Sequence, residues 1–411
     1  MTTGTVVIVG GGQAGAWAAR SLRDLGHAGP IVMVSEERHA PYERPPLSKE
    51  ILLGTGSADE LTIHSHEELA ALHIDVRPGV RCTSLDREGR RVILEGGEQL
   101  VYDTLILATG GRARRLDLPG VDSPRVHTLR TLDDAHRLRA ALTGEPGHVL
   151  VVGGGWIGLE VAASARALGA EVTVLEAADR LCARSVAPDV SAALLDLHRE
   201  QGVSVRLETS LTALQDQDDR LRVTLSDGTQ LECQHLIMAA GLVANDELAV
   251  QAGLQCANGV LVDRQCRSSD PHIYAAGDVA VMETSLAGRR MRLESWQNAQ
   301  DQGMAVAQAI MGQDVDYCPV PMVWSQQYDQ FIQISGHVHA GDQWTERRTS
   351  TGILRFYLDA TGTVVAAIGM NAGRDFRFAR QLVERKARVP AAVLADPGQP
   401  LNKVASTAIT A

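Results

Sequence analysis

Two glycine-rich fingerprints are the residues of this chain best suited to chemistry. V-V-I-V-G-G-G-Q-A-G occupies residues 6–15, and V-L-V-V-G-G-G-W-I-G occupies residues 149–158. In each copy an apolar run typical of a buried parallel strand leads into glycines spaced G-x-G-x-x-G. That spacing allows a tight turn, close approach of the backbone to a pyrophosphate, and close packing of the next helix on the strand. We therefore expect two dinucleotides, and a chain that binds two usually passes electrons between them.

Each fingerprint is followed by the other elements of a βαβ unit. We expect helices over residues 16–25 and 159–168, whose positive N-terminal ends would face the pyrophosphates. Each unit then returns to a strand, and the two strands end at Glu36 and Glu176. These carboxylates stand where the motif needs an acceptor for the ribose hydroxyls of adenosine. A single G-x-G-x-x-G would be weak evidence, but two complete units, each with its acid, strongly favour nucleotide binding.

Composition sets limits on the class of protein. With 411 residues, of which 45% are hydrophobic, the chain can form two or three packed domains. No apolar stretch reaches the ~20 residues that span a bilayer, and the chain enters a strand without a signal peptide, so we expect a soluble cytoplasmic protein. A formal charge of −11 disfavours nucleic acid and anionic membranes as partners.

Cysteine and histidine spacings argue against a metal. The six cysteines are scattered without a C-x-x-C, which disfavours an iron–sulfur cluster, structural zinc or a redox dithiol within the chain. None of the thirteen histidines has a metal-ligand spacing. We predict no metal site.

The order of motifs indicates how the domains are arranged. An apolar strand at 104–110 leads to a basic connection at 111–120, which reads as a crossing between domains. A similar strand at 236–241 leads back, so one dinucleotide domain is inserted into another. From about residue 318 short alternating runs predict a small antiparallel sheet with a terminal helix. We expect a first nucleotide domain at 1–112 and 241–317, a second at 113–240, and a C-terminal domain at 318–411.

These motifs together resemble the FAD-dependent pyridine nucleotide–disulfide reductase superfamily. Within it the chain is similar to the ferredoxin reductases of bacterial aromatic-ring-hydroxylating dioxygenases, especially those of 3-phenylpropionate/cinnamate systems, and to putidaredoxin reductase. The most specific matches are P-Y-E-R-P-P-L-S-K at 41–49, A-T-G at 108–110, the second fingerprint extended to Leu159-Glu160, G-D-V-A at 277–280, E-S-W-Q-N-A at 294–299, and Trp324-Ser325. The resemblance implies an α/β fold with two Rossmann-like, glutathione-reductase-like domains and a C-terminal α+β domain.

The resemblance also assigns FAD to the first fingerprint and NADH to the second. It implies an FAD site formed by Gly10, Gly12, Ala14, Gly15, Glu36, Lys49, Cys82, Thr109, Gly110, Arg130, Asp278 and Trp296. It implies an NADH site formed by Gly153, Gly155, Ile157, Gly158, Glu160, Glu176 and Arg184. The carboxylate of Glu176 would repel a 2′-phosphate, so we predict NADH over NADPH, although Arg180 lies close enough in sequence to reach such a phosphate.

Three residues are candidates for catalytic roles through the resemblance. Lys49 and Glu160 would form an ion pair beside the flavin, where Lys49 stabilises reduced flavin and Glu160 helps to position nicotinamide. The alternative is a solvated loop lysine and helix glutamate. Trp324 would shield the flavin or lie on the route by which electrons leave, and a plain packing tryptophan is the equally open alternative.

The resemblance implies a specific electron path. NADH would reduce FAD by hydride transfer, and FAD would pass single electrons to a [2Fe–2S] ferredoxin of the Rieske type that feeds a dioxygenase. A basic segment could steer an acidic ferredoxin, or simply be a solvated helix face; it contains Arg374, Arg377, Arg380, Arg385, Lys386 and Arg388.

Rival functions remain open at this point. One is an NADH oxidase or peroxidase, which the absence of a cysteine from P-P-L-S-K at 45–49 disfavours. Another is an NADH-sensing flavoprotein similar to apoptosis-inducing factor. A cytochrome P450 in place of the dioxygenase is also compatible with the sequence.

Overall fold

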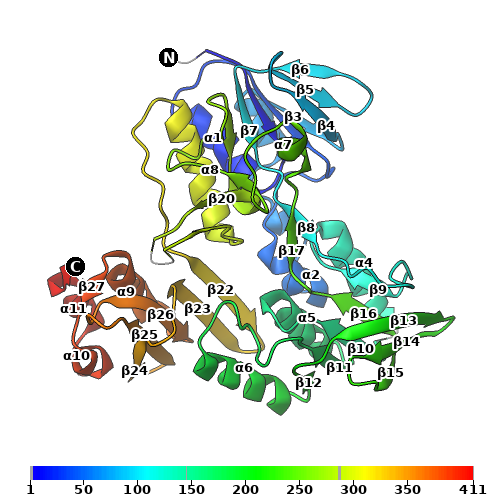
Figure 1. Cartoon of the computed structure of the whole chain (residues 1–411), viewed down its shortest axis with the longest axis vertical. Helices are drawn as coiled ribbons and strands as arrows, with labels where there is room; N and C mark the ends of the chain where they lie inside the picture. The colour runs from blue at the N-terminus through cyan, green and yellow to red at the C-terminus, as the bar shows by residue number, and fades with distance from the viewer. Residues whose placement is uncertain (1–2, 145, 286–287, 411) are drawn as a thin grey trace. The chain divides into compact units, whose positions relative to one another are not determined.

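The computed structural model describes residues 3–144, 146–285 and 288–410 and divides the chain into two units (Figure 1). The first unit consists of Met1–Glu43, Leu61–Arg112 and Val243–Val323. The second consists of Arg44–Glu60, Ala113–Leu242 and Trp324–Ala411. The chain passes between them at five points, two of which lie in the short strands β8 (Gly111–Ala113) and β17 (Leu242–Ala244). Among the described residues, no helix combines the length and the apolar character needed to cross a membrane.

A five-stranded parallel sheet is the centre of the first unit, and its strands in spatial order are β19 (Ile273–Ala275), β7 (Thr104–Leu107), β1 (Val6–Val9), β2 (Ile31–Ser35) and β3 (Ile74–Pro78). Successive side chains of a strand point to opposite faces. Ile8 lies in a buried cluster with residues of helices α1 (Gln13–Asp24) and α8 (Trp296–Ile310). Val9 lies in another cluster, with residues of the small antiparallel sheet β4 (Cys82–Asp86), β5 (Arg91–Leu94) and β6 (Gln99–Val101). Both faces are covered, which explains the uninterrupted apolar run of the fingerprint.

The second unit contains a parallel sheet of the same kind, with strands in the order β12 (Ser204–Arg206), β11 (Glu171–Leu175), β10 (His148–Val152), β16 (His235–Met238) and β9 (Val126–Thr128). Its helices are α4 (Leu132–Gly144), α5 (Trp156–Ala167) and α6 (Pro188–Glu200). A three-stranded antiparallel sheet packs against this parallel sheet; its strands are β13 (Leu211–Gln217), β14 (Arg220–Leu225) and β15 (Gln230–Cys233). The two sheets share an apolar cluster that includes Leu150 of β10 and Leu221 of β14.

The C-terminal part of the second unit is an antiparallel sheet with helices, drawn from yellow to red in Figure 1. Its strands in spatial order are β22 (Met322–Gln327), β23 (Gln330–Gly336), β26 (Val364–Met370), β25 (Ile353–Leu358) and β24 (Gln343–Arg348). The apolar residues of α9 (Gly373–Glu384) are buried, and Phe376 packs where Gly369 of β26 leaves room. Two short helices follow, α10 (Ala391–Ala395) and α11 (Leu401–Thr407). The expected α/β fold class, with parallel sheets and a C-terminal antiparallel sheet, is confirmed.

Short elements complete both units. The first contains α3 (His66–Ala71), α7 (Glu247–Gln251), β18 (Val260–Leu261), β20 (Ala280–Glu283) and β21 (Arg290–Met291). The second contains the 3-10 turn η1 (Pro45–Ser48), the single-turn helix α2 (Glu50–Leu53), and β27 (Ala387–Arg388) paired with β28 (Ile409–Thr410).

The helices after the fingerprints begin earlier than the sequence predicts. Helix α1 starts at Gln13 and α5 at Trp156, whereas we expected starts at residues 16 and 159. The reason is that the third glycine of each motif lies inside the first helical turn and not before it. The expected left-handed glycines after these helices are present, because Gly26 has φ of 87° and Gly169 has φ of 93°.

Close contact between α1 and α8 predicts that Gly303 of the first unit does not tolerate a side chain. A Cβ atom on Gly303 would lie 2.5 Å from the backbone oxygen of Ala14 and 3.2 Å from the backbone nitrogen of Ala18. We expect Gly303→Ala to lower the free energy of unfolding in urea by about 2 kcal/mol, because the two helices must separate. The control is Gly144→Ala, since a Cβ atom there meets nothing within 4 Å. Equal stability of the two variants would contradict this packing.

Acid sensitivity is expected in the second unit from His127 of β9. Burial, and the neighbouring His235, lower the pKa of His127 to about 4. The pKa of histidine in the unfolded chain is near 6.5. At a pH between this pKa and that of the folded state, His127 is therefore protonated in the unfolded chain but not in the folded one. The free energy of unfolding should therefore be insensitive to this group above pH ~6.5 and fall as the pH decreases towards about 4. Urea titrations should give a shallower fall for His127→Gln and an unaltered fall for the exposed control His136→Gln.

Candidate active site

The first fingerprint forms a backbone cradle in the first unit. Gly10 has φ of 123°, and a Cβ atom there would lie 2.1 Å from the backbone oxygen of Ala108. Gly12 is the N-cap of α1, and no side chain caps this helix. The N–H groups of the first turn are thus available at the positive end of the helix dipole. This arrangement fits a pyrophosphate.

The second fingerprint repeats this geometry in the second unit. Gly153 has φ of 114°, and a Cβ atom there would lie 2.4 Å from the backbone oxygen of Ala239. Gly155 is the N-cap of α5, again without a side-chain cap, and a Cβ atom on it would meet no atom within 4 Å. The space in front of the helix is open, so this cradle also fits a pyrophosphate. Ile157, beside it, is exposed.

The acids that end the two βαβ units differ in their surroundings. The side chain of Glu36 is exposed, with Arg81 at 3.9 Å. Glu176 is held, because its Oε2 accepts from the backbone N–H of Gly154 at 2.7 Å and its Oε1 from that of Ala178 at 2.8 Å. Carboxylate oxygens can accept further bonds, so Glu176 stays able to receive a ribose hydroxyl beside the glycine turn.

Arg180, which the sequence suggested could bind the 2′-phosphate of NADPH, donates its hydrogen bonds within its own loop and to α6. Its guanidinium donates to the backbone oxygen of Val186 at 2.7 Å, to Oγ of Ser191 at 2.9 Å and to the backbone oxygen of Ala183 at 2.8 Å. These bonds close the loop after β11 and occupy the guanidinium. Arg184 is exposed, and its Nη2 lies 3.6 Å from the Cβ position of Gly241.

Several further residues of the first unit form a polar setting for a ligand. Asp278 lies in the 3-10 turn η3 (Gly277–Val279), which is held by the fully buried Gln302: its Oε1 accepts from the backbone N–H of Gly277 at 2.8 Å. Trp296 is the first residue of α8, whose N-cap Ser295 accepts from the backbone N–H of Asn298. Among the described residues, buried polar atoms without a hydrogen-bond partner include Gln13 Nε2 and Oε1, Trp17 Nε1, Trp296 Nε1 and Gln300 Oε1. Such atoms need partners, and a dinucleotide at the first fingerprint would supply them to Gln13, which follows the N-cap Gly12.

The other expected FAD residues have mainly structural contacts. Cys82 donates from its thiol to the backbone oxygen of Ser84, and burial raises its pKa to about 11, which keeps it protonated. Thr109 Oγ1 donates to the backbone oxygen of Asn245 at 2.7 Å, and the backbone N–H of Asn245 donates to the oxygen of Gly110 at 3.0 Å. In the second unit, the backbone oxygen of Arg130 accepts from Arg44 at 2.6 Å.

A buried ion pair lies in the second unit. Lys49 Nζ donates to Glu160 Oε2 at 2.6 Å and to the backbone oxygen of Pro45 at 2.8 Å. Ser48 Oγ donates to Glu160 Oε2 at 2.5 Å, and Ser325 Oγ donates to Oε1 at 2.7 Å. The ion pair expected between Lys49 and Glu160 is present, and it is not a pair of solvated side chains, since Glu160 is only 4% exposed. Trp324 of β22 adds its ring, 5.4 Å from Lys49 Nζ and 5.9 Å from the ring of Phe331.

Two serines that bracket Glu160 were not recognised as site residues from the sequence. Ser48 precedes Lys49, and Ser325 follows Trp324, so both lie within motifs that the resemblance highlights. Ser164 of α5 also donates to the backbone oxygen of Ser48 at 2.6 Å, which fixes the loop to the helix that carries Glu160. The adjacency of a small hydroxyl residue to each motif was the only available signal.

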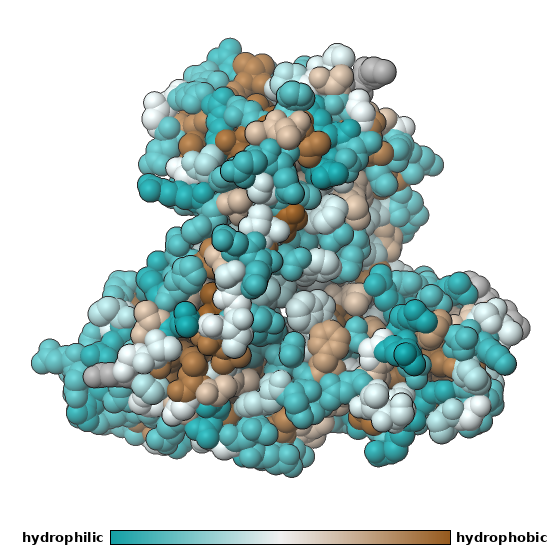
Figure 2. Space-filling model, turned by 180° about the vertical axis from the view of Figure 1, so that it is seen from behind, coloured by the Kyte–Doolittle hydropathy of each residue, from teal (hydrophilic) through white to brown (hydrophobic). Residues whose placement is uncertain are grey.

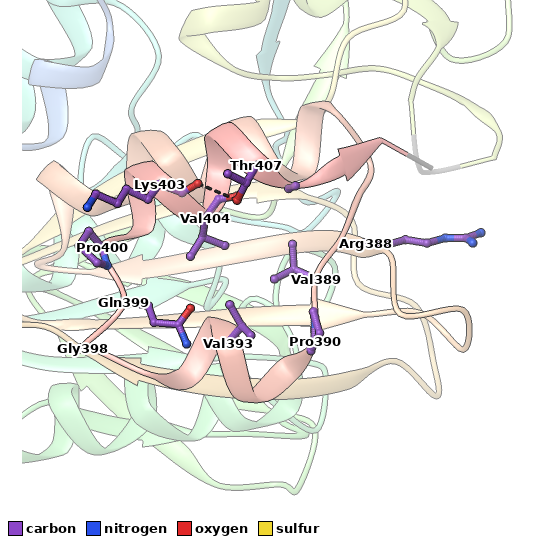
Figure 3. A pocket seen from close by; sticks show the side chains of 11 residues that line it. Arg388, Val389, Pro390, Val393, Gly398, Gln399, Pro400, Lys403, Val404 and Thr407 are labelled. Carbon is purple, nitrogen blue, oxygen red and sulfur yellow. Dashed lines mark hydrogen bonds between the residues drawn. The ribbon is translucent and has the colours of Figure 1, made fainter.

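A cavity of about 410 Å³ lies elsewhere in the second unit, beside α10 and α11 (Figure 3). Val389, Val393 and Val404 line it, and none of the expected site residues does. Arg388 and Lys403 belong to its rim, but their side chains point away from it in Figure 3. We find no support there for cofactor binding.

The basic segment near α9 is partly engaged within the second unit. Arg380 pairs with Glu384 at 2.6 Å, Arg385 donates to the backbone oxygen of Ala405 at 3.0 Å, and Arg377 stacks on Phe378 at 4.4 Å. Figure 2 shows a mainly hydrophilic face with scattered apolar residues. A docking role for the basic segment stays a prediction.

Comparison with known proteins identifies the family of this chain. The model of the pyridine nucleotide–disulphide oxidoreductase family matches residues 4–303, and the reductase C-terminal model matches residues 322–405. The chain belongs to the pyridine nucleotide–disulphide oxidoreductase family. This membership confirms the expected FAD and NADH cofactors and the expected class of enzyme, an FAD-dependent oxidoreductase.

Individual members of the family match along nearly the whole chain. The 3-phenylpropionate/cinnamic acid dioxygenase ferredoxin–NAD(+) reductase component of Photorhabdus laumondii is 37% identical over 96% of this chain and 99% of its own. The p-cumate 2,3-dioxygenase system ferredoxin–NAD(+) reductase component of Pseudomonas putida is 40% identical over 97% of this chain and 98% of its own. A crystal structure of the covalent putidaredoxin reductase–putidaredoxin complex matches with a TM-score of 0.94 and 35% identity over 99% of both chains.

Burial of the ion pair predicts a large cost when one partner is removed. We expect Lys49→Met to lower the free energy of unfolding by about 3–5 kcal/mol, because Glu160 would stay buried without its cation. The double variant Lys49→Met/Glu160→Gln should recover most of this loss in urea titrations. The control, Arg20→Met, breaks the exposed pair of Arg20 with Asp24 and should cost less than about 1 kcal/mol. A loss in Lys49→Met no larger than that of the control would contradict the description of the site.

Proposed function

We propose that this chain is an NADH:ferredoxin oxidoreductase whose ferredoxin feeds an aromatic-ring-hydroxylating dioxygenase. The observation that carries the proposal is the pair of uncapped helix N-termini behind matching glycine turns, at Gly12 and Gly155. It stands in a chain similar along its length to proteins named as ferredoxin–NAD(+) reductase components of dioxygenase systems.

The residues of the first fingerprint would hold FAD. The backbone at Gly10, Gly12, Ala14 and Gly15 would bind the pyrophosphate, and Glu36 the adenosine ribose. Asp278 would accept from the ribitol chain, and the N-terminus of α8 at Trp296 would face the flavin pyrimidine edge. FAD, when bound, takes a hydride from NADH and gives electrons up singly, which suits a one-electron iron–sulfur acceptor. Cys82, Thr109, Gly110, Lys49 and Arg130 complete the proposed FAD set.

The residues of the second fingerprint would hold NADH. Gly153, Gly155, Ile157 and Gly158 would pack against the nucleotide, and Glu176 would accept from the ribose hydroxyls. Arg184 is a further, exposed candidate for this site.

Three residues would act near the reacting rings. Glu160 would position nicotinamide, and Lys49 would stabilise the negative charge of reduced flavin. Trp324 would shield the ring or lie on the electron exit route.

The partner and its setting follow from the same proposal. The acceptor would be an iron–sulfur ferredoxin, which the similarity to ferredoxin–NAD(+) reductase components supports. We propose that it is a [2Fe–2S] ferredoxin of the Rieske type. The basic residues near α9 would attract an acidic ferredoxin. A cytoplasmic location is supported by six cysteines that are all free thiols. We retain the boundaries 1–112 with 241–317 for the FAD domain, 113–240 for the NADH domain and 318–411 for the interface domain.

Anaerobic stopped-flow spectroscopy tests the proposed function. NADH should bleach the flavin of the purified protein rapidly, and a Rieske-type ferredoxin should then restore the oxidised spectrum. Fast reoxidation by oxygen but not by ferredoxin would instead indicate an NADH oxidase. A stable bleached complex that no acceptor reoxidises would indicate a sensor of NADH. Failure of NADH to bleach the flavin would contradict all three functions.

The choice of nucleotide depends on Glu176. We expect Glu176→Ala to reduce the preference for NADH over NADPH in kcat/KM by about tenfold or more, since each factor of ten is 1.4 kcal/mol and both a hydrogen bond and a repulsive charge are lost. Glu171→Ala, at the exposed start of β11, is the matched control and should keep the preference. An unchanged ratio in Glu176→Ala would show that the acid does not select the nucleotide.

A further inference from the structure

The hydrogen bonds of Glu160 continue through the second unit to the side chain of Tyr328. Gln327 Nε2 donates to Ser325 Oγ at 3.1 Å, and His198 Nε2 lies 2.9 Å from Gln327 Oε1. Tyr328 O–H lies 3.1 Å from His198 Nδ1. This series of hydrogen bonds connects α5, β22 and α6. Its inner members are buried: Ser325 and Gln327 are 1% exposed and His198 is 0% exposed.

The donor and acceptor groups fix the direction of every hydrogen bond in this series. The carboxylate of Glu160 can only accept, so Ser325 must donate to it. The Ser325 oxygen is then free to accept, and it receives the amide N–H of Gln327. The amide oxygen of Gln327 must consequently face His198, which has to carry its proton on Nε2. His198 Nδ1 is left as an acceptor, and the hydroxyl of Tyr328 donates to it.

The ring of His198 is suited to this role because it is neutral. Burial lowers the pKa of His198 below its ordinary value, so the imidazole presents one donor and one acceptor at neutral pH. A hydroxyl or amide could rotate to satisfy either direction, but the ring nitrogens can exchange roles only by moving a proton.

We propose that His198 is a positioning residue for Glu160: its Nε2–H tautomer orients the amide of Gln327, which directs the hydroxyl hydrogen of Ser325 onto the carboxylate. The effect on the reaction rests on the proposed function, in which Glu160 positions nicotinamide. The coupling between His198 and Glu160 does not, because it depends only on contacts within this unit.

The Glu160→Gln variant separates this proposal from a purely structural role for His198. The ammonium of Lys49 can only donate, so the new amide must turn its oxygen to Lys49 and its N–H to Ser325. Ser325 would then donate to Gln327, the amide of Gln327 would flip, and His198 would carry its proton on Nδ1, facing the Tyr328 oxygen. A substitution at one end of the chain is thus expected to change the tautomer at the other.

Nitrogen-15 NMR of histidine-labelled, flavin-loaded protein measures this directly, with the His198 signals assigned by comparison with His198→Gln. We expect a protonated Nε2 in the wild type and a protonated Nδ1 in Glu160→Gln. The matched control is Glu346→Gln, which alters another carboxylate of the same unit and should leave the wild-type tautomer. A protonated Nδ1 in the wild type, or an unchanged tautomer in Glu160→Gln, would overturn the proposal. The wild-type measurement stands even if the variant fails to fold.

Single-turnover reduction of the flavin by NADH tests the consequence for the reaction. We expect His198→Leu to slow it by about three- to tenfold, the effect of losing about one hydrogen bond. His198→Gln, which restores a donor to Gln327, should recover most of the rate. In a Ser325→Ala background His198→Leu should have no further effect. A full His198→Leu effect in that background, or no effect in the wild type, would overturn the positioning role. If NADH bleaches no flavin at all while the NMR result holds, the proposed function fails and the coupling stands.

Discussion

The buried pair of Lys49 and Glu160 is the interaction on which the second unit's candidate site depends. Two charges taken out of water are costly unless each finds both an opposite charge and enough hydrogen bonds. Here the anion accepts from Lys49, Ser48 and Ser325, and the cation also donates to Pro45. These residues come from the 44–60 segment, α5 and β22, so the charges can be satisfied only when three distant parts of the chain assemble. The pair therefore belongs to the candidate site and also forms only when these three segments have folded together.

The two fingerprints show a second constraint, which operates at the level of the backbone. Gly10 and Gly153 occupy the left-handed region, and each approaches a backbone oxygen of a neighbouring strand end so closely that no side chain would fit. The result in both units is a helix N-terminus without a capping side chain. The repeated geometry follows from repeated sequence, and it supplies two anion-binding ends in one chain.

The sequence predicted what depends on local spacing. The βαβ units, the glycines after the helices and the antiparallel C-terminal sheet all follow from patterns within some thirty residues. The start of α1 at Gln13 was missed by three residues, because the pattern does not show that the third glycine already lies in the helix. The ion pair of Lys49 with Glu160 was anticipated only through the resemblance, since 111 positions separate its members.

Long-range contacts were beyond prediction for a physical reason. Arg180 could be read as a phosphate ligand until its bonds to Val186, Ser191 and Ala183 were visible. His198 carried no signal, because a buried histidine without nearby ligands resembles any core residue. Its significance comes from Gln327, which lies 129 positions away. Such contacts are decided by how the elements pack and not by the spacing of residue types.

The most direct test of the central claim is the ionisation of Glu160. Infrared difference spectra between the wild type and Glu160→Gln, with carbon-13-labelled glutamate, report its charge state at neutral pH. Because the side chains that the described part of the chain places on its oxygens, those of Lys49, Ser48 and Ser325, all donate, the spectrum should contain the bands of an ionised carboxylate. A band of a protonated carboxylic acid in the wild type would contradict the ion pair and with it this account of the site.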